Sequence, residues 1–497
     1  MTPSFFFAKL KQSVKFVYLC MEKKKRTKIQ FKAEYIAGLA FLTTFAFFQF
    51  AYPYHLIRRE QQNLFLYDWD YIRQTYTGTG WLVRFVTDFF EQFFHLPVFG
   101  PVIVAFALAA IGWVTYSICR KFLDKWPSFA IAMVLFGWSF MRETGNIYYT
   151  RYTFVVLGYL ALILAALQFK KHILKAAAFV VLMIFGIWAL GSPYHENYGK
   201  AWSTPKFDYE RLIGLDAETA KENWGRVLKL SKKDLFMKEA SYFYNLAHVM
   251  KGDIGDRLLE HSQGQAYDLV LRVTSEQSVF TNCIAGEAWY QMGNMSTAEQ
   301  SSITTLQASP KHTGVRYLKR LAEIGLVKGE EIEAGKYLNI LNRTLFYRKW
   351  ARSMMPGHRD EATQAELLEK RAKLDSVDFV HLGDVPRDVF KGLLAANPGN
   401  TVARNYLLCY DLMRYDLDQF MEDYSPRPVN SRLYHEAALI WLSQYDKLTQ
   451  ESATALGISE SDVNRMNAFG RTPDAYRNTY WYYYLRALNR MDNAQNN

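Results

Sequence analysis

The stretch that decides the fold is VFGPVIVAFALAAIGWVTYSIC, residues 98–119. It carries no charged side chain, and it is as long as the roughly 20 apolar residues that an α-helix needs to cross a bilayer. Arg120, Lys121 and Lys125 follow it directly. The stretch therefore predicts a transmembrane helix that ends in a basic turn.

Further apolar segments predict four more spans, from about residue 35 to 51, 126 to 141, 152 to 169 and 173 to 190. The segment at 126–141 is short, so a re-entrant segment is the alternative for it. With five spans, the basic N-terminus and the basic turns at 120–125 and 170–175 all lie on the cytoplasmic side, as positive charge favours. A re-entrant third segment would put the turn at 170–175 outside. We therefore expect five spans and an extracytoplasmic chain after Gly191.

The net charge of +11 is concentrated at the N-terminus. Residues 1–33 hold nine Lys and Arg against one acid, Glu22, which leaves the remainder close to balanced. A basic run before an apolar span is attracted to anionic lipid. We therefore expect membrane lipid as a partner and no nucleic acid. Residues 4–20 lack a small-residue cleavage site, and Met21 is an alternative start to Met1.

The four cysteines, Cys20, Cys119, Cys283 and Cys409, have no CxxC spacing. Under the predicted topology Cys283 and Cys409 would share an oxidising compartment, which leaves open both free thiols and a disulfide.

The first outside loop, residues 52–97, contains an amphipathic helical segment. Trp81, Phe85, Phe89 and Phe93 recur at a spacing of four, which places them on one helical face. Two interpretations remain open: the segment lies flat in the membrane interface, or it packs against the soluble domain above.

After residue 192 the pattern changes to helices of 12–18 residues separated by Gly, Pro, Asn and Ser. The clearest helix runs from Phe236 to Met250 and ends at Gly252. Residues 397–400, Asn-Pro-Gly-Asn, resemble the start of a tetratricopeptide-type repeat. We expect an all-α fold: about five transmembrane helices followed by a degenerate, tetratricopeptide-like α-solenoid. The predicted domains are a cytoplasmic N-terminus (1–34), a transmembrane domain (35–191) and an extracytoplasmic domain (192–497).

Asp68-Trp69-Asp70 is the candidate catalytic motif. Acidic residues just after the first span resemble those of multi-pass glycosyltransferases with lipid-linked sugar donors, in which paired carboxylates can bind a metal or supply a base. The alternative is a solvated turn whose acids balance Arg58, Arg59 and Arg73.

Other motifs of catalysis are absent from the sequence. It has no phosphate loop, HExxH, G-x-S-x-G or paired Cys or His ligands, so we expect no cofactor, no metal and no catalytic residue beyond Asp68 and Asp70. Arg142, Glu143 and Arg151 are expected to anchor helices at the interface, and His435-Glu436 is expected to be a surface pair.

Several short motifs carry a resemblance across most of the chain: Glu60-Gln61, Leu64-Phe65, Gly255-Asp256-Arg257-Leu258, Ala308-Ser309-Pro310, the 336–351 stretch and Asn405-Tyr406-Leu407-Leu408. With them the chain resembles a bacterial family of unknown function that has several membrane spans and a tetratricopeptide-like tail. The resemblance implies an envelope location. We expect a scaffold anchored in the bacterial inner membrane that binds an envelope protein; the alternative is a reduced glycosyltransferase-like enzyme.

Overall fold

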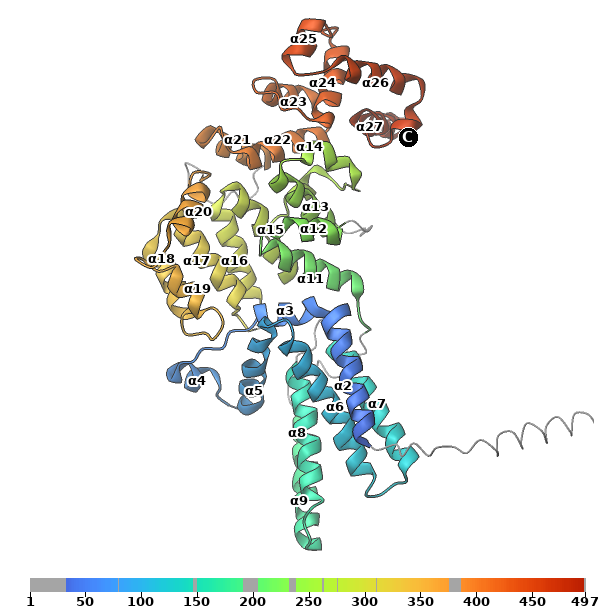
Figure 1. Ribbon diagram of the computed structural model, residues 1–497, viewed down its shortest axis with the longest axis vertical. Helices are drawn as coiled ribbons and strands as arrows, with labels where there is room; N and C mark the ends of the chain where they lie inside the picture. The colour runs from blue at the N-terminus through green and yellow to red at the C-terminus, as the bar shows by residue number, and fades with distance from the viewer. Residues whose placement is uncertain are drawn as a thin grey trace, which may run out of the picture.

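The computed structural model describes residues 33–78, 80–145, 150–190, 204–231, 238–261, 263–274, 276–309, 311–374 and 386–495. Within these ranges the chain forms helices and no strand, which confirms the all-α prediction. The molecule is elongated. A bundle of long helices lies at one end, and a larger domain of shorter helices extends from it to the C-terminus (Figure 1).

The bundle contains α2 (Ala33–Ala46), the short π-helical turn η1 (Phe47–Ala51), α6 (Phe99–Cys119), α7 (Lys125–Glu143), α8 (Thr150–Ala166) and α9 (His172–Leu190). Each predicted span falls on one of these helices. Helix α6 is central and packs against α2, α7 and α8, with Val104, Leu108 and Ile111 buried in the core.

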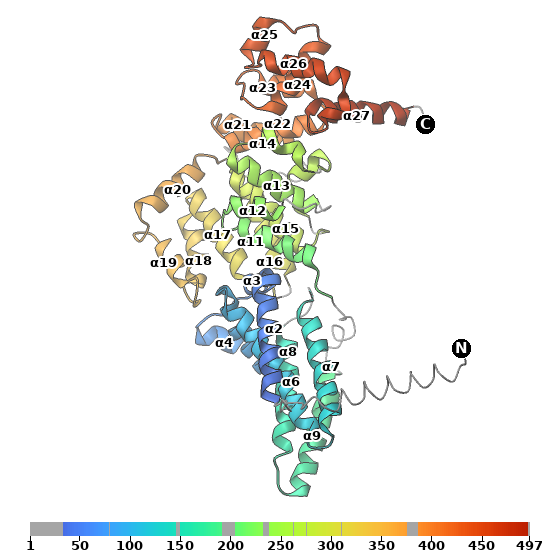
Figure 2. The same ribbon diagram turned by 45° about the vertical axis from the view of Figure 1, so that its right-hand side comes forward.

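The bundle helices alternate in direction. Helix α2 leads into α3 (Pro53–Gln61) at the boundary with the helical domain, and the start of α6 lies at that same boundary, where Gly100 meets Phe94 and Leu56. Helices α8 and α9 form an antiparallel hairpin, because the Tyr159 hydroxyl donates to the Leu182 carbonyl across their turn at 3.2 Å. Consequently the basic turns at 120–125 and 170–171 lie at the end away from the helical domain (Figures 1 and 2).

Among the described residues, two helical segments are long and apolar enough to cross a membrane, Glu34–Ala51 and Phe99–Cys119. The segments Thr150–Ala166 and His172–Ile184 are apolar but shorter. Helix α7 carries Lys125 at its start and Arg142 and Glu143 at its end. Five membrane spans are therefore not confirmed, although five helices are present.

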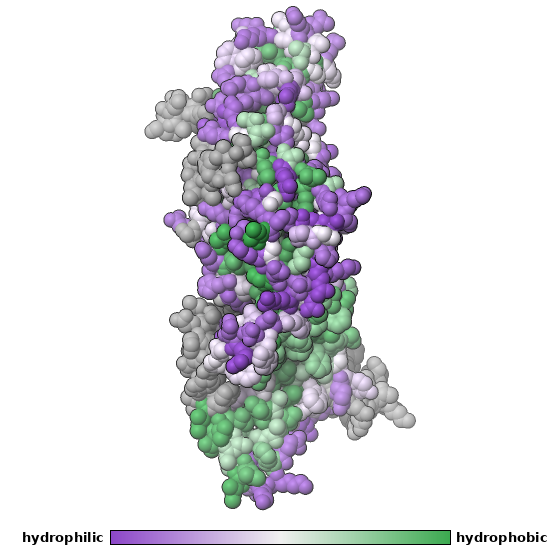
Figure 3. All heavy atoms as spheres, turned by 90° about the vertical axis from the view of Figure 1, so that its left-hand side faces the viewer, coloured by the Kyte–Doolittle hydropathy of each residue, from purple (hydrophilic) through white to green (hydrophobic). Residues whose placement is uncertain are grey.

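The bundle exposes large apolar side chains on every one of its helices. Among the most exposed are Phe50 at 78%, Phe106 at 67%, Val134 at 73% and Ile173 at 84%. Figure 3 shows this apolar surface on one face, ending in a hydrophilic tip, whereas the surface of the helical domain is mostly hydrophilic. Apolar patches of this extent are rare on water-soluble monomers.

The first half of the helical domain comprises α11 (Phe207–Thr219), α12 (Trp224–Ser231), α13 (Lys238–Lys251), α14 (Ile254–Arg257), η3 (Leu258–Glu260), η4 (Ala266–Leu269), α15 (Val279–Met292), α16 (Met295–Ala308), α17 (Val315–Lys328), α18 (Glu331–Leu341), α19 (Arg348–Ser353) and α20 (Glu361–Arg371). Consecutive helices pack as neighbours, most closely α15 on α16 and α17 on α18.

The second half comprises α21 (Pro386–Ala396), α22 (Thr401–Met413), α23 (Leu417–Tyr424), α24 (Arg432–Gln444), α25 (Gln450–Ala455), α26 (Glu460–Arg471), η5 (Pro473–Tyr476) and α27 (Tyr480–Gln495). Here the chain turns back, because α22 packs against α13, α14 and α15. In a solenoid each repeat contacts only its sequence neighbours. The predicted α-solenoid is therefore not confirmed. Helices α16–α20 lie to one side of the line that runs from the bundle to the C-terminal helices (Figure 1).

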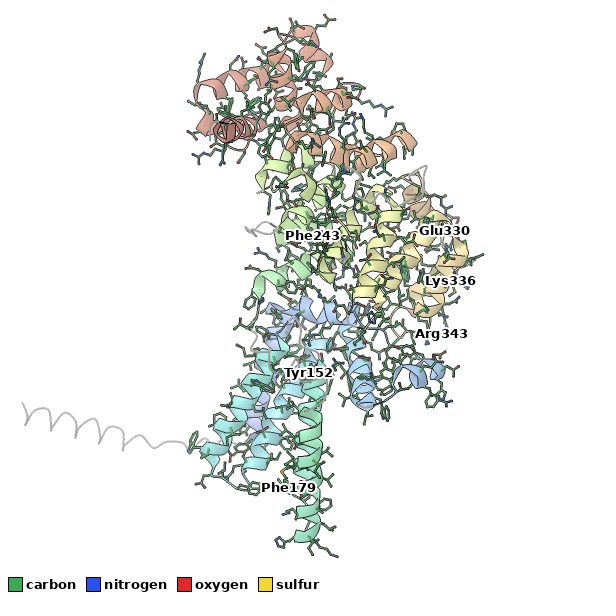
Figure 4. All side chains as sticks on the ribbon, turned by 180° about the vertical axis from the view of Figure 1, so that it is seen from behind. Tyr152, Phe179, Phe243, Glu330, Lys336 and Arg343 are labelled. Atoms are coloured by element: carbon green, nitrogen blue, oxygen red, sulfur yellow. The ribbon has the colours of Figure 1, made fainter. Side chains whose placement is uncertain are left out.

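The predicted helix at 236–250 is confirmed as α13 over Lys238–Lys251, while Phe236 lies outside the described residues. Phe243 is fully buried in the middle of the helical domain (Figure 4). Gly252 has a φ of +77°, and its N–H donates to the Val249 carbonyl at 3.0 Å. This left-handed glycine ends the helix as the sequence predicts.

Cys119, Cys283 and Cys409 are free thiols. The disulfide between Cys283 and Cys409 that the sequence leaves open is therefore not formed. Burial raises the pKa of both Cys283 and Cys409 to about 12, so both are unreactive thiols at neutral pH. Cys20 lies outside the described residues.

The first loop is folded and contacts both the bundle and the helical domain. It contains α3, α4 (Trp69–Thr75), α5 (Trp81–Glu91) and η2 (Gln92–His95). Leu64 and Leu66 join the core of α17 and α18. Helix α5 packs along α8, and Phe89 and Phe93 contact Phe65 and Phe346 respectively. Phe85, Phe89 and Phe93 of the aromatic face thus pack within the protein, whereas Trp81 is exposed. The position of α5 in a membrane interface stays a prediction.

Candidate functional site at the junction of bundle and helical domain

Helix α3 connects the two parts of the molecule. Pro53 occupies its first turn, where a missing N–H is tolerated. Gly214 of α11 lies so close to Tyr54 that a Cβ there would come within 2.7 Å of the ring. The Arg58 guanidinium lies over the Phe280 ring at 4.6 Å. We call α3 and the side chains that bind it the junction.

Toward the bundle, the junction is an ion pair between Arg59 and Glu143. The Glu143 side chain is fully buried and that of Arg59 is 10% exposed. Arg59 Nη1 also donates to Thr150 Oγ1 at 2.8 Å, and Nη2 donates to the Glu143 carbonyl at 2.8 Å. The Thr153 hydroxyl donates to Glu143 Oε2 at 2.5 Å. One arginine therefore holds the end of α7 and the start of α8.

His55 completes this side of the junction. Its Nε2 lies 3.0 Å from Arg59 Nη2. Burial, together with the charges of Arg59 and Arg58, lowers the pKa of His55 well below its usual value. The imidazole is consequently neutral, and its unprotonated Nε2 accepts from the guanidinium.

Toward the helical domain, Glu210 of α11 caps the start of α3. Glu210 Oε1 accepts from the Tyr54 N–H at 2.6 Å, and Oε2 accepts from the His55 N–H at 2.9 Å. These N–H groups belong to the first turn of a helix, which has no internal acceptors for them. Burial raises the pKa of Glu210 to about 8, and the two backbone donors oppose that rise.

Glu210 is the first anchor of α3 to the helical domain. A second anchor connects α3 to the core of that domain through Arg316 of α17. Its guanidinium binds Asp216 of α11 in a two-point contact at 2.6 and 2.7 Å and reaches Glu287 of α15 at 3.1 Å. Nη1 also lies 3.3 Å from Gln61 Oε1 at the end of α3. These two carboxylate groups are each 4% exposed, so this is a buried charge network.

The third anchor joins α5 to the helical domain. Lys311 Nζ contacts Asp88 at 2.7 Å, Glu91 at 3.3 Å and Asn63 at 3.1 Å. Burial raises the pKa of Glu91, while Lys311 opposes the shift. The Val315 N–H donates to the Asn63 carbonyl at 3.1 Å. The loop is thus held by both backbone and charged contacts.

A small pocket lies beside these anchors. Glu60, Gln92 and Tyr347 are among its lining residues. The Tyr347 hydroxyl donates to both Glu60 oxygens, at 2.9 and 3.1 Å, and His95 Nδ1 lies 3.6 Å from Glu60. The carboxylate therefore already has protein partners.

The contacts of the junction fix the bundle and the helical domain relative to each other. Arg59, Glu210, Arg316 and Lys311 each bind partners on other elements at hydrogen-bond distance. Paired and hydrogen-bonded charges of this kind fix geometry and register. Within the described ranges, no group of three or more His, Cys, Asp or Glu could hold a metal ion.

The structure gives the candidate acids Asp68 and Asp70 separate surroundings. Asp68 caps α4 by accepting from the Tyr71 N–H at 3.0 Å, and its other oxygen pairs with Arg343 at 3.0 Å. Asp70 is exposed in the first turn of α4. Arg343 lies at the edge of the helical domain that faces α4 (Figure 4). This resembles the turn alternative, but with Arg343 as the partner in place of Arg58, Arg59 or Arg73.

Other predicted sites also change character. Arg142 lies over the Trp138 ring at 4.6 Å and is buried, as is Glu143, so neither is an exposed interface anchor. The prediction of a surface pair at His435-Glu436 is wrong: both are buried, and Glu436 accepts from the Tyr480 N–H at 2.7 Å. It caps α27 as Glu210 caps α3.

A family model matches residues 27–196 and 193–487, which cover both parts of the molecule and the junction between them. The chain belongs to a family of unknown function, DUF6057. No curated protein and no solved structure matches the chain. The DUF6057 match begins in the basic N-terminal segment and ends within α27.

Sequence reasoning missed the junction in this DUF6057 chain. The sequence predicts Glu143 as a helix anchor at the interface and Arg59 as one of three cations that could balance Asp68 and Asp70, and it does not single out Glu210. A usable signal existed: Arg142-Glu143 stands at the end of an apolar helix, where a buried acid requires a cation from elsewhere. The identity of that cation, 84 residues away, is not encoded locally.

Proposed function

We propose that the chain is a membrane-anchored helical scaffold of the bacterial cell envelope, which presents its helical domain to an envelope protein. The observation that carries the proposal is the apolar surface around the bundle, with side chains such as Phe106 and Ile173 largely exposed. Lipid is the environment that such a surface requires.

The alternating helix directions support five crossings. Both basic turns, with Arg120 and Lys121 in one and Lys170 and Lys171 in the other, lie at the bundle end away from the helical domain. Lys and Arg accumulate in cytoplasmic loops. In this orientation the bundle lies in the inner membrane, the N-terminus is cytoplasmic and the helical domain is extracytoplasmic.

Helices α4 and α5 lie beside the upper part of the bundle (Figure 1). Trp69, Trp81 and Leu82 are 70%, 49% and 55% exposed there. Trp is enriched at headgroup depth, where an apolar ring and a polar edge are both accommodated. These residues act as interfacial anchors in our proposal.

A scaffold needs a binding domain held at a fixed position relative to its membrane anchor, and the junction provides that. The helical domain exposes apolar residues on one projecting arm, α18 to α20, where Ile332 is 82% and Leu368 is 61% exposed. We place the protein partner against this arm. The near-balanced charge after the N-terminus gives no basis for nucleic-acid binding.

Topology is tested by labelling single cysteines in spheroplasts with a membrane-impermeant maleimide, in a chain whose native cysteines are replaced. We expect Trp69→Cys and Ile332→Cys to react from outside, and Phe122→Cys and Phe169→Cys to react only after permeabilisation. If the maleimide labels Phe169→Cys from outside but labels Phe122→Cys only after permeabilisation, the bundle crosses the membrane four times and not five.

Function is tested by placing a photocrosslinking amino acid at Ile332 or Leu368 in living cells. We expect one dominant envelope protein, at equal yield in the Asp68→Asn/Asp70→Asn variant. A position on the far side of α18, Leu338, which is fully buried, is the matched negative control. If a lipid-linked sugar is recovered in place of a protein, and is lost in the double variant, the scaffold proposal fails and the glycosyltransferase alternative takes its place.

A further inference from the structure

An apolar groove runs along the bundle between α2 and α7, with α6 as its floor. Small residues of α6, Ala109 and Gly112, form the floor together with Trp113 and Tyr116. The walls are Ile36, Ala37 and Ala40 of α2 and Phe129, Ala132, Met133 and Phe136 of α7. Phe136 borders the groove closely at Gly112, since a Cβ there would be in van der Waals contact with the Phe136 side chain at 3.6 Å.

The groove lies at the basic end of the bundle. Tyr116 precedes Arg120 by one helical turn, and Phe129 follows Lys125 by one turn. The turn between α6 and α7 therefore brings Arg120, Lys121 and Lys125 to the mouth of the groove, with Asp124 as the one acid among them. Arg120 and Lys121 are exposed. An apolar channel below a cationic rim has the chemistry of a phospholipid that carries negative charge.

We propose that this groove binds one acyl chain of an anionic phospholipid, with its headgroup held by the basic turn at 120–125. The inference rests on the proposed membrane location and specifies a ligand for it. Charge decides against a helix from a second copy in the same orientation, because that copy would bring its own basic turn to Arg120 and Lys121. An anionic headgroup is attracted to the same turn.

The test uses the full chain in detergent with phosphatidylglycerol that carries a photoreactive diazirine in one acyl chain, and phosphatidylcholine with the same chains as the headgroup control. After illumination, lipid-modified peptides are quantified by mass spectrometry. The groove variants are Gly112→Leu and Ala37→Leu. The matched control is Gly38→Leu, which adds the same side chain on the exposed face of α2, where a Cβ meets nothing within 4 Å.

We expect labelling of peptides that contain residues 36–40, 109–116 and 129–136 in the wild type and in Gly38→Leu. Filling the groove should lower the labelling of these peptides about sixtyfold if three methylenes are displaced, each contributing roughly fourfold. Arg120→Gln/Lys121→Gln should lower the phosphatidylglycerol preference by about fivefold per lost cation and leave phosphatidylcholine labelling unchanged.

Equal labelling of Gly112→Leu, Ala37→Leu and Gly38→Leu would overturn the inference, and so would equal labelling by the two headgroups, which indicates annular lipid only. A dimer whose mass disappears in Gly112→Leu would replace the acyl chain by a second copy as occupant. Carbonate extraction keeps these outcomes separate from the proposed function. A chain that carbonate releases from membranes refutes the membrane location itself, whereas a retained chain with an unselective groove refutes only this inference.

Discussion

Arg59→Met is the substitution that tests the junction most directly. It removes the guanidinium but keeps most of the aliphatic stem, so the packing of α3 changes little. Glu143 then keeps the Thr153 hydroxyl and loses its cation, while its side chain stays fully buried. Removing one member of a buried pair costs about 3–5 kcal/mol, because the remaining charge is uncompensated. Domains are typically stable by only about 5–15 kcal/mol, so a large fraction of the stability is lost.

The assay is thermal unfolding of the purified chain in detergent, followed by tryptophan fluorescence. For a chain of this size we expect the midpoint to fall by about 6–15 °C, at roughly 2–3 °C per kcal/mol. Arg343→Met is the matched control. Arg343 and Asp68 form an exposed pair, with side chains 56% and 27% exposed, and such pairs contribute about 0–1 kcal/mol.

A double variant that lacks both charges completes the experiment. Arg59→Met/Glu143→Leu removes both charges, and we expect it to recover at least half of the loss seen in Arg59→Met. If Arg59→Met unfolds no earlier than Arg343→Met, the pair does not hold the two parts together and the account of the junction is wrong.

Three further outcomes follow from the structure. Glu210 has a folded-state pKa of about 8, so it binds its proton more tightly in the folded chain than in the unfolded one. Its contribution to the free energy of unfolding is therefore complete below about pH 4.5. That contribution falls as the pH rises toward 8, by up to about 1.4 kcal/mol per pH unit. Unfolding measured from pH 5 to 8 should show this slope, and Glu210→Gln should remove it; an unchanged slope assigns it to other groups. Gly252→Ala should lose about 1 kcal/mol in chemical denaturation, because φ is +77°, whereas Gly335→Ala inside α18 should gain about 0.5–1 kcal/mol; similar effects would contradict the left-handed cap. Asp68→Asn should change the unfolding midpoint by less than about 2 °C, because Asn also caps a helix and the Arg343 pair is exposed.

Local sequence patterns predict the helices well and their partners poorly. The apolar run at 98–119 becomes α6, and the spacing that ends at Gly252 becomes α13, because helix formation depends on neighbours three and four residues apart and on caps. The return of α22 onto α13–α15 has no such signal. Asn400 caps α22 and its side chain also donates to the Met292 carbonyl, 108 residues away, and only the second contact determines the path of the chain.

The candidate site shows the same division. Asp68 and Asp70 were noticed because they stand close together in the sequence, yet Asp68 binds Arg343, which lies 275 residues away. The residues that join the two parts are single ionisable side chains in unrelated segments. Glu210 is 156 residues from Tyr54, and Lys311 is 223 from Asp88. Residue type predicts that a buried charge needs a partner, but the fold selects which one.

If the bundle lies in a membrane, the polar character of the junction has a physical reason. Apolar contacts do little to hold elements together beside lipid, since hydrocarbon tails are equally apolar competitors. Directional contacts keep their strength there and also fix register. Helix α3 uses three different kinds: its Arg59 side chain binds Glu143 of the bundle, its first N–H groups bind Glu210, and Gln61 at its end meets Arg316. A helix of nine residues that is held at its start and twice in its last turn can neither slide nor rotate independently. The helical domain therefore follows any tilt of the bundle, and substitution at any one of the three contacts should loosen this coupling without unfolding either core.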